Sequence, residues 1–163
     1  MFNKIWIFLF AFSIFLFSCA TSYKTTKSKL NKKATYAVVP FYNFTETPMA
    51  GLRVSHLIEG VLRAKNYRVL NRYWKEEEDL SAEEIKNLIT ELKNKNVNYI
   101  VSGTVNEWRY KTGIDGEPAV SFTIYVLDTS TGNIVWSGAL SRSGLSYESL
   151  GVTAQSLIEK VIK

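Results

Sequence analysis

Three features of the sequence carry side chains that could do chemistry. Cys19 is the only cysteine, His56 is the only histidine, and residues 76–79 form a run of four carboxylates. A thiolate can act as a nucleophile, an imidazole as a general base or metal ligand, and clustered carboxylates as a cation site. No second histidine or cysteine could complete a zinc site, and no glycine-rich phosphate-binding motif is present. We therefore expect a protein that is not an enzyme and that uses no cofactor or metal.

The histidine and the acidic run both have ordinary structural interpretations. His56 lies beside Arg53 and Glu59 on the polar side of a predicted helix, away from the apolar stripe, which indicates a surface or interface position. The acidic run comes just before the start of another predicted helix, where negative charge is favourable. Neither feature predicts a catalytic or metal site.

Cys19 follows a segment with the pattern of a signal peptide. Lys4 precedes an apolar run of roughly 13 residues, whereas a helix needs about 20 residues to cross a bilayer. A lone cysteine cannot form an internal disulfide. The segment Leu16-Phe17-Ser18-Cys19-Ala20 resembles the lipobox of bacterial lipoproteins. That resemblance implies acylation of the Cys19 thiol, including by palmitate, with membrane lipid as a partner; Ala20, where an Asp would favour inner-membrane retention, implies an outer-membrane anchor facing the periplasm.

The excess positive charge is local. The formal net charge is +5, and Lys24, Lys27, Lys29, Lys32 and Lys33 lie in one short stretch without an acidic residue. Because this stretch has little to bury, we expect a lipidated cysteine and flexible tether over residues 19–34, after a signal peptide at 1–18 and before a domain at 35–163. Export and the absence of a base-stacking motif argue against nucleic acid as a partner.

Residues 35–163 predict a single α/β domain. A strand over Thr35–Phe41 is followed by a helix that begins at Thr47-Pro48, and Tyr67–Asn71 reads as a second strand. Ser81 and Glu84 form a capping box for a second helix, and a last helix begins near Ser146. Between them lie three strands joined by turn sequences, at Asn98–Tyr110, Ala119–Leu127 and Asn133–Arg142. The expected order is β-α-β-α-β-β-β-α, a mixed sheet with helices mainly on one face.

Aromatic side chains are more numerous than a small core requires. Trp108 and Tyr110 fall near a predicted hairpin tip, and Trp136 lies in the last strand. They are candidates for a membrane or subunit interface, with plain core packing as the alternative.

Several segments together carry a family resemblance. These are Ala37-Val38-Val39-Pro40-Phe41-x-Asn43-x-Thr45, Tyr67-Arg68-Val69-Leu70, Asn98 to Val105, and Asp128 to Ser137. They resemble the superfamily of bacterial envelope lipoproteins that includes CsgG, LpoB and PelC, and the segment from Asn43 to Arg53 is most similar to PelC-like members. This implies a non-catalytic, homo-oligomeric ring in an exopolysaccharide (Pel-like) export apparatus, with an outer-membrane exporter or a cell-wall component as a further partner.

Two other functions stay open within the superfamily. One is activation of a peptidoglycan synthase, as in LpoB, and the other is secretion or assembly, as in CsgG. A flexible tether of about 15 residues spans on the order of 20 Å, which is too short to cross the periplasm. This favours the export component over the LpoB-like activator.

Overall fold

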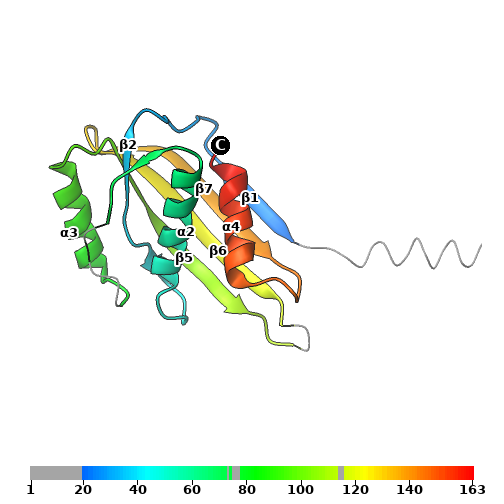
Figure 1. Ribbon diagram of the computed structural model, residues 1–163. Helices are drawn as coiled ribbons and strands as arrows, with labels where there is room; N and C mark the ends of the chain where they lie inside the picture. The colour runs from blue at the N-terminus through cyan, green and yellow to red at the C-terminus, as the bar shows by residue number, and fades with distance from the viewer. Residues whose placement is uncertain (1–19, 73, 75–77, 114–115) are drawn as a thin grey trace, which may run out of the picture.

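The computed structural model describes residues 20–72, 74, 78–113 and 116–163; the predicted signal peptide 1–18 and Cys19 lie outside the described residues. The described residues form one α/β domain built on a seven-stranded mixed sheet (Figure 1). Its strands lie in the order β1-β7-β6-β5-β2-β4, with β3 also paired to β5. The predicted succession β-α-β-α-β-β-β-α is confirmed, and β1 and β3 are additional short strands.

The antiparallel half of the sheet is the predicted meander. In the register between β5 and β6, Val101 lies opposite Val126 and Val105 lies opposite Phe122, so the apolar side chains share one face. A β-bulge interrupts this register between Val105 and Glu107. The three strands are β5 (Tyr99–Tyr110), β6 (Pro118–Asp128) and β7 (Ile134–Ser143).

The parallel half is shorter. The strand β2 (Thr35–Val38) lies between β5 and β4 (Arg68–Val69), and it runs parallel to both. The two-residue strand β3 (Tyr42–Asn43) pairs with β5 further along. Parallel neighbours need crossover connections, and the helices α2 and α3 supply them.

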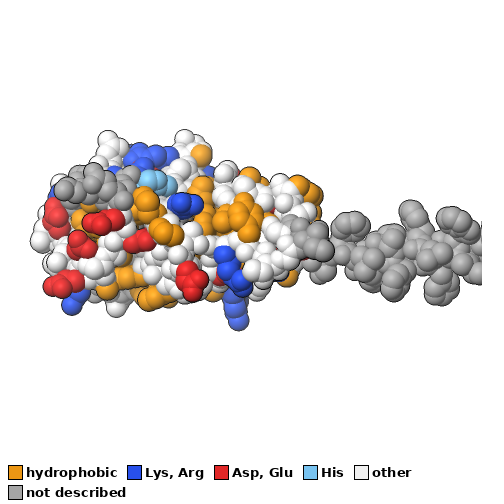
Figure 2. All heavy atoms as spheres, turned by 90° about the horizontal axis from the view of Figure 1, so that it is seen from below, with side chains coloured by type: hydrophobic (Ala, Val, Ile, Leu, Met, Phe, Trp, Pro, Cys, Tyr) orange, Lys and Arg blue, Asp and Glu red, His pale blue; other side chains and the backbone are white. Residues whose placement is uncertain are grey.

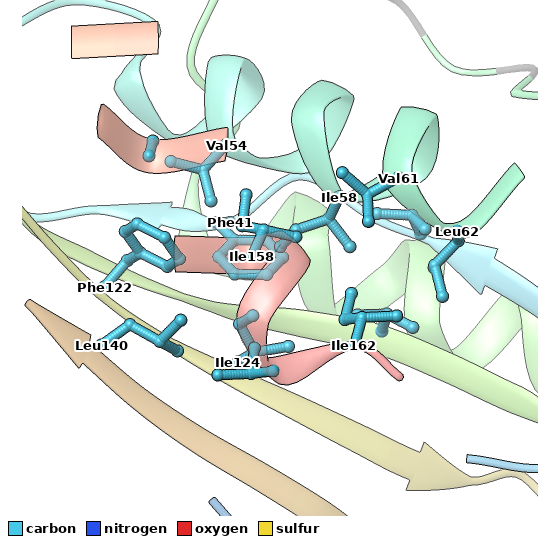
Figure 3. Packing of buried hydrophobic residues seen from close by; sticks show 14 of the residues in the cluster. Phe41, Val54, Ile58, Val61, Leu62, Phe122, Ile124, Leu140, Ile158 and Ile162 are labelled. Atoms are coloured by element: carbon cyan, nitrogen blue, oxygen red, sulfur yellow. The ribbon is translucent and has the colours of Figure 1, made fainter. Parts of the chain in front are cut away.

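Two helices cover one face of the sheet. The helices α2 (Ala50–Ala64) and α4 (Leu150–Val161) lie side by side on the meander (Figure 1). Figure 3 shows their apolar side chains pointing toward those of β6 and β7. Burial of one such side chain stabilises the fold by about 1.5–3 kcal/mol. The fully buried contributors include Ile58, Leu62, Phe122, Ile124, Leu157 and Ile158.

The helix α3 (Ala82–Lys93) packs on the opposite face, at the parallel end of the sheet. Alternation along β2 explains this, because Tyr36 and Val38 face α2 while Ala37 and Val39 face α3. The predicted capping box is confirmed: the Ser81 hydroxyl accepts from the Glu84 backbone N–H, and the Glu84 carboxylate accepts from the Ser81 N–H.

Two predicted helix starts are wrong. Thr47 does not cap α2; its hydroxyl instead donates to the Trp108 carbonyl at 2.6 Å, and the N-cap residue is Met49 in a left-handed conformation. The last helix begins not near Ser146 but after Ser149, whose hydroxyl accepts from the Val152 N–H. For Thr47 a long-range hydrogen bond satisfies the hydroxyl that the local pattern assigned to a cap, whereas for α4 the capping serine lies three residues further along the chain.

The N-terminal stretch also differs from the expected flexible tether. Thr21–Thr25 forms the strand β1, which pairs antiparallel with β7 from Thr21 opposite Arg142 to Thr25 opposite Gly138. The physical reason is the open edge of β7, whose backbone groups gain hydrogen bonds from any extended neighbour. The sheet therefore begins two residues after Cys19.

Candidate functional site at the anchor end of the sheet

The strand ends nearest to Cys19 converge at one end of the domain, which we call the anchor end. The Ala20 carbonyl accepts from the Ser143 N–H at 2.9 Å, and the Pro118 carbonyl accepts from the Gly144 N–H at 2.8 Å. Tyr110 lies opposite Pro118 in the sheet. Cys19 itself lies outside the described residues, but one peptide unit, about 3.8 Å between Cα atoms, joins it to Ala20. Lipid attached to Cys19 would thus meet the domain at this end.

Three exposed aromatic side chains lie at the anchor end. Phe44 is 70% exposed, Tyr110 50% and Tyr147 82%. They come from three segments: the residue after β3, the last residue of β5, and the loop between β7 and α4. Aromatic side chains are favoured at membrane–water interfaces, where an apolar ring and a polar edge meet different surroundings. No helix within the described ranges is long and apolar enough to span a bilayer.

Only one of the three aromatic residues singled out from the sequence is exposed there. Trp108 and Trp136 are each 3% exposed and belong to the core between the sheet and the helices α2 and α4. Trp136 lies opposite Val126, far along β7 from the anchor end. Tyr110 keeps the predicted place near the hairpin tip. Phe44 and Tyr147 were missed because single aromatics in loop sequence give no periodic signal.

A network around Asn43 fixes the loop that carries Phe44. The Asn43 amide nitrogen donates to the Thr47 carbonyl at 2.8 Å, and its oxygen accepts from the Thr45 N–H and hydroxyl. The Phe44 N–H donates to the Val105 carbonyl at 2.9 Å. Local bonds of this kind hold a backbone turn in one shape. Asn43 and Thr45 both belong to the segment that carries the resemblance found from the sequence.

Asp79 joins the same network from the acidic run. Its carboxylate accepts from the Asn43 amide at 3.0 Å and from the Met49 N–H at 2.7 Å, just before α2. Glu76 and Glu77 lie outside the described residues. Among the residues that are described, no group of three or more His, Cys, Asp or Glu side chains could hold a metal ion. Asp79 thus ties the chain before α3 to the start of α2.

His56 lies in an ion-pair cluster on the outer side of α2. The buried Glu59 carboxylate pairs with Arg72 at 2.6 Å and with Arg63 at 2.9 Å, and the Arg72 guanidinium also contacts His56 Nε2. Glu59 is only 7% exposed, so these charge-assisted hydrogen bonds offset its desolvation. The cluster fastens α2 to the segment after β4 and gives His56 a structural setting.

The turn between β6 and β7 is held by an aspartate. The Asp128 carboxylate accepts from the Ser130 hydroxyl at 2.6 Å, the Ser130 N–H at 2.8 Å and the Thr131 N–H at 3.1 Å. These bonds, led by the Ser130 hydroxyl, lower the pKa of Asp128. Gly132 completes the turn at a φ of 74°, which favours glycine. This turn is the Asp-Thr-Ser-Thr-Gly segment of the family resemblance.

Comparison with solved structures identifies the family. The domain is similar to two crystal structures of PelC from Paraburkholderia phytofirmans, each described as a dodecamer, one of them a variant. For both the sequence identity is 35% and the TM-score is 0.72, over 88% of this chain and 95% or 96% of the PelC chain. The chain belongs to the PelC family. No protein-family model matches the sequence, and no curated protein is significantly similar to it.

A more distant structure shares the PelC-like fold. Lipoprotein GNA1162 from Neisseria meningitidis aligns at 20% identity and a TM-score of 0.55, over 71% of this chain and 84% of that one. The 35% identity to PelC confirms the expected resemblance to the PelC family. In this PelC-family chain, the segment that suggested PelC, from Asn43 to Arg53, is the loop and first turn that present Phe44 at the anchor end.

Proposed function

We propose that this chain is an outer-membrane lipoprotein that faces the periplasm and forms a ring of identical copies as a non-catalytic part of a Pel-like exopolysaccharide exporter. In this proposal acylated Cys19 holds each copy on the membrane. The ring acts by its shape and surface, not by bond-making chemistry. The observation that carries the proposal is the 35% identity to dodecameric PelC over nearly the whole length of both chains.

The anchor end supports a position close against the membrane. Since β1 begins at Thr21, at most about 7 Å of extended chain separates Cys19 from the sheet. Phe44, Tyr110 and Tyr147 are exposed at that end and would rest in the interfacial layer. Two or more acyl chains give durable anchoring, whereas one gives only reversible binding. So short a linker also argues against a role that requires reaching across the periplasm.

The test is the mass of the assembled protein. The full chain would be expressed in a Gram-negative host, extracted in mild detergent and measured by native mass spectrometry, beside residues 20–163 prepared without the cysteine. Labelling with a palmitate analogue, with Cys19→Ala as the control, would report acylation separately. We expect a closed ring of many copies in at least one form and label only on the cysteine-containing chain. A strict monomer in both forms would refute the ring.

A further inference from the structure

One edge of the domain carries a basic groove. It has a volume of about 270 Å³ and lies between β1, the segment after it and the end of α4. Within the part of the chain that the structure describes, its lining contains four lysines and no acidic side chain. These lysines are all exposed, and none forms an ion pair with any described residue. The lysines are Lys27, Lys29, Lys160 and Lys163. Tyr23, which is 52% exposed, adds an aromatic ring, and the buried Trp136 also lines the groove.

The opposite edge carries an acidic groove. It has a volume of about 380 Å³ and lies along α3 and the chain that precedes it. Among the described residues, its lining contains three carboxylates and no lysine or arginine. Lys95, outside the lining, pairs with Glu91 at 3.1 Å. Figure 2 shows acidic side chains gathered over the end of the molecule that carries α3. The carboxylates belong to Glu78, Glu84 and Glu91, and the apolar part of the lining comes from Trp74, Leu80 and Leu88.

The two grooves lie at the same level of the sheet. Trp136, in the basic groove, is opposite Val126, and Val126 is opposite Val101 on β5. The neighbouring residue Ile100 lies beneath α3, which carries the acidic groove. β1 and β4 are the two ends of the strand order. Figure 1 shows β1 and α3 on opposite sides of the domain, so the grooves that these elements line lie on opposite sides as well.

The anchoring membrane is a poor occupant for the basic groove. From Ala20 at the anchor end to Lys27 the chain runs along β1, and seven residues at about 3.3 Å each span roughly 23 Å. Lipid head groups beside the anchor end would not reach that far. A second copy of the chain, anchored to the same membrane beside the first, would present its acidic groove at the same distance from the membrane as this basic groove.

We propose that the acidic groove of one copy docks on the basic groove of the next, in a head-to-tail contact that repeats around a ring. This inference rests on the proposed ring and names the surfaces that close it. A contact between two different patches builds a ring when the rotation from one copy to the next closes on itself. A contact between two identical patches ends at a dimer. Opposite charges set the register and the partner, while the aromatic and apolar walls of the two grooves provide the buried area.

Charge reversal tests the contact in the full acylated chain. One variant is Lys27→Glu/Lys29→Glu/Lys160→Glu and the other is Glu78→Lys/Glu91→Lys. Among the described residues, these changes remove the exposed Glu91–Lys95 ion pair, which contributes little to stability. In the first variant three carboxylates outweigh the remaining Lys163, so both edges are acidic. In the second variant two lysines outweigh the remaining Glu84, so both edges are basic. Each alone should therefore need about 10-fold or more protein to assemble, whereas an equimolar mixture restores attraction at every contact, in an alternating ring.

A matched control places the same charge change elsewhere. Lys33→Glu/Arg53→Glu/Lys111→Glu alters three exposed cations outside both grooves and removes one exposed ion pair, Lys111–Glu117 at 3.2 Å, as the acidic-groove variant also removes one; it should assemble like the unmodified chain. Rescue by the mixture, together with normal assembly of the control, supports the contact. If the unmodified chain forms rings and the reversed variants form them equally well, the inference is overturned and the ring stands. If the unmodified chain is monomeric, the proposed function and this contact both fail.

Discussion

Replacing Gly103 by alanine should destabilise the domain severely. A Cβ atom there would lie 1.9 Å from the Thr123 carbonyl oxygen and 2.4 Å from Cε2 of Phe41. A comfortable carbon–oxygen contact is about 3.3 Å or longer, so β5 and β6 would have to separate locally by roughly 1.4 Å. Phe41 is only 2% exposed and has no open space to move into.

The loss in the free energy of unfolding has two parts. Separating the strands weakens one or two hydrogen bonds near the pair Gly103 and Ile124, at about 1 kcal/mol each. Overpacking against Phe41 adds about 1–3 kcal/mol. The sum, about 2–5 kcal/mol, is a large part of the 5–15 kcal/mol that stabilises a typical domain.

The chain offers a glycine control. Gly60 lies in the exposed interior of α2, and a Cβ there meets nothing within 4 Å. Gly60→Ala should raise the free energy of unfolding by about 0.5–1 kcal/mol. Both variants would be measured by urea unfolding of residues 20–163, followed by circular dichroism. The reasoning is refuted if Gly103→Ala lies within 0.5 kcal/mol, on the order of measurement error, of the unmodified domain.

Three further outcomes are expected. Ser81→Ala removes the cap of α3 and should lower the free energy of unfolding by about 1 kcal/mol; an unchanged urea midpoint would contradict it. Burial raises the pKa of Tyr36 above its ordinary value of 10.0, so its contribution to the free energy of unfolding is fully present below pH 10 and is lost as the pH rises above it. Tyr36→Phe should therefore reduce the loss of stability at alkaline pH. An equally steep loss in thermal melts measured across that pH range would contradict this. Phe44→Ser/Tyr147→Ser should reduce sedimentation of residues 20–163 with anionic vesicles by about 10-fold or more without lowering the melting temperature, and equal sedimentation would argue against contact of the anchor end with lipid.

Local signals predicted most of the fold. The capping box of Ser81 and Glu84 and the turn from Asp128 to Gly132 are each satisfied by bonds within four residues. Such features depend little on the rest of the chain, which is why the sequence reveals them. The alternation of Phe122, Ile124 and Val126 likewise reports a single buried face of β6.

The strand β1 shows what a local pattern misses. Thr21–Thr25 is polar and carries Lys24, which is typical of a linker. Its pairing depends on the open edge of β7, more than 110 residues away in sequence. The alternation of Thr21, Tyr23 and Thr25 with Ser22 and Lys24 is the one signal that could have suggested a strand. The consequence bears on the proposed function, because a paired β1 would hold the domain close to acyl chains on Cys19.

The exposure of Tyr110 at the anchor end depends on another feature that the local sequence pattern does not reveal, the β-bulge in β5. Strict alternation along β5 from Val101 and Val105 would turn Glu107 and Arg109 toward the core and leave Trp108 outside. The bulge between Val105 and Glu107 shifts the pattern by one residue, so Trp108 lies opposite Val120 on the buried face. The same shift points Tyr110 along that face beyond the cover of the helices, where it is half exposed. One inserted residue thus decides which aromatic fills the core and which remains available at the anchor end.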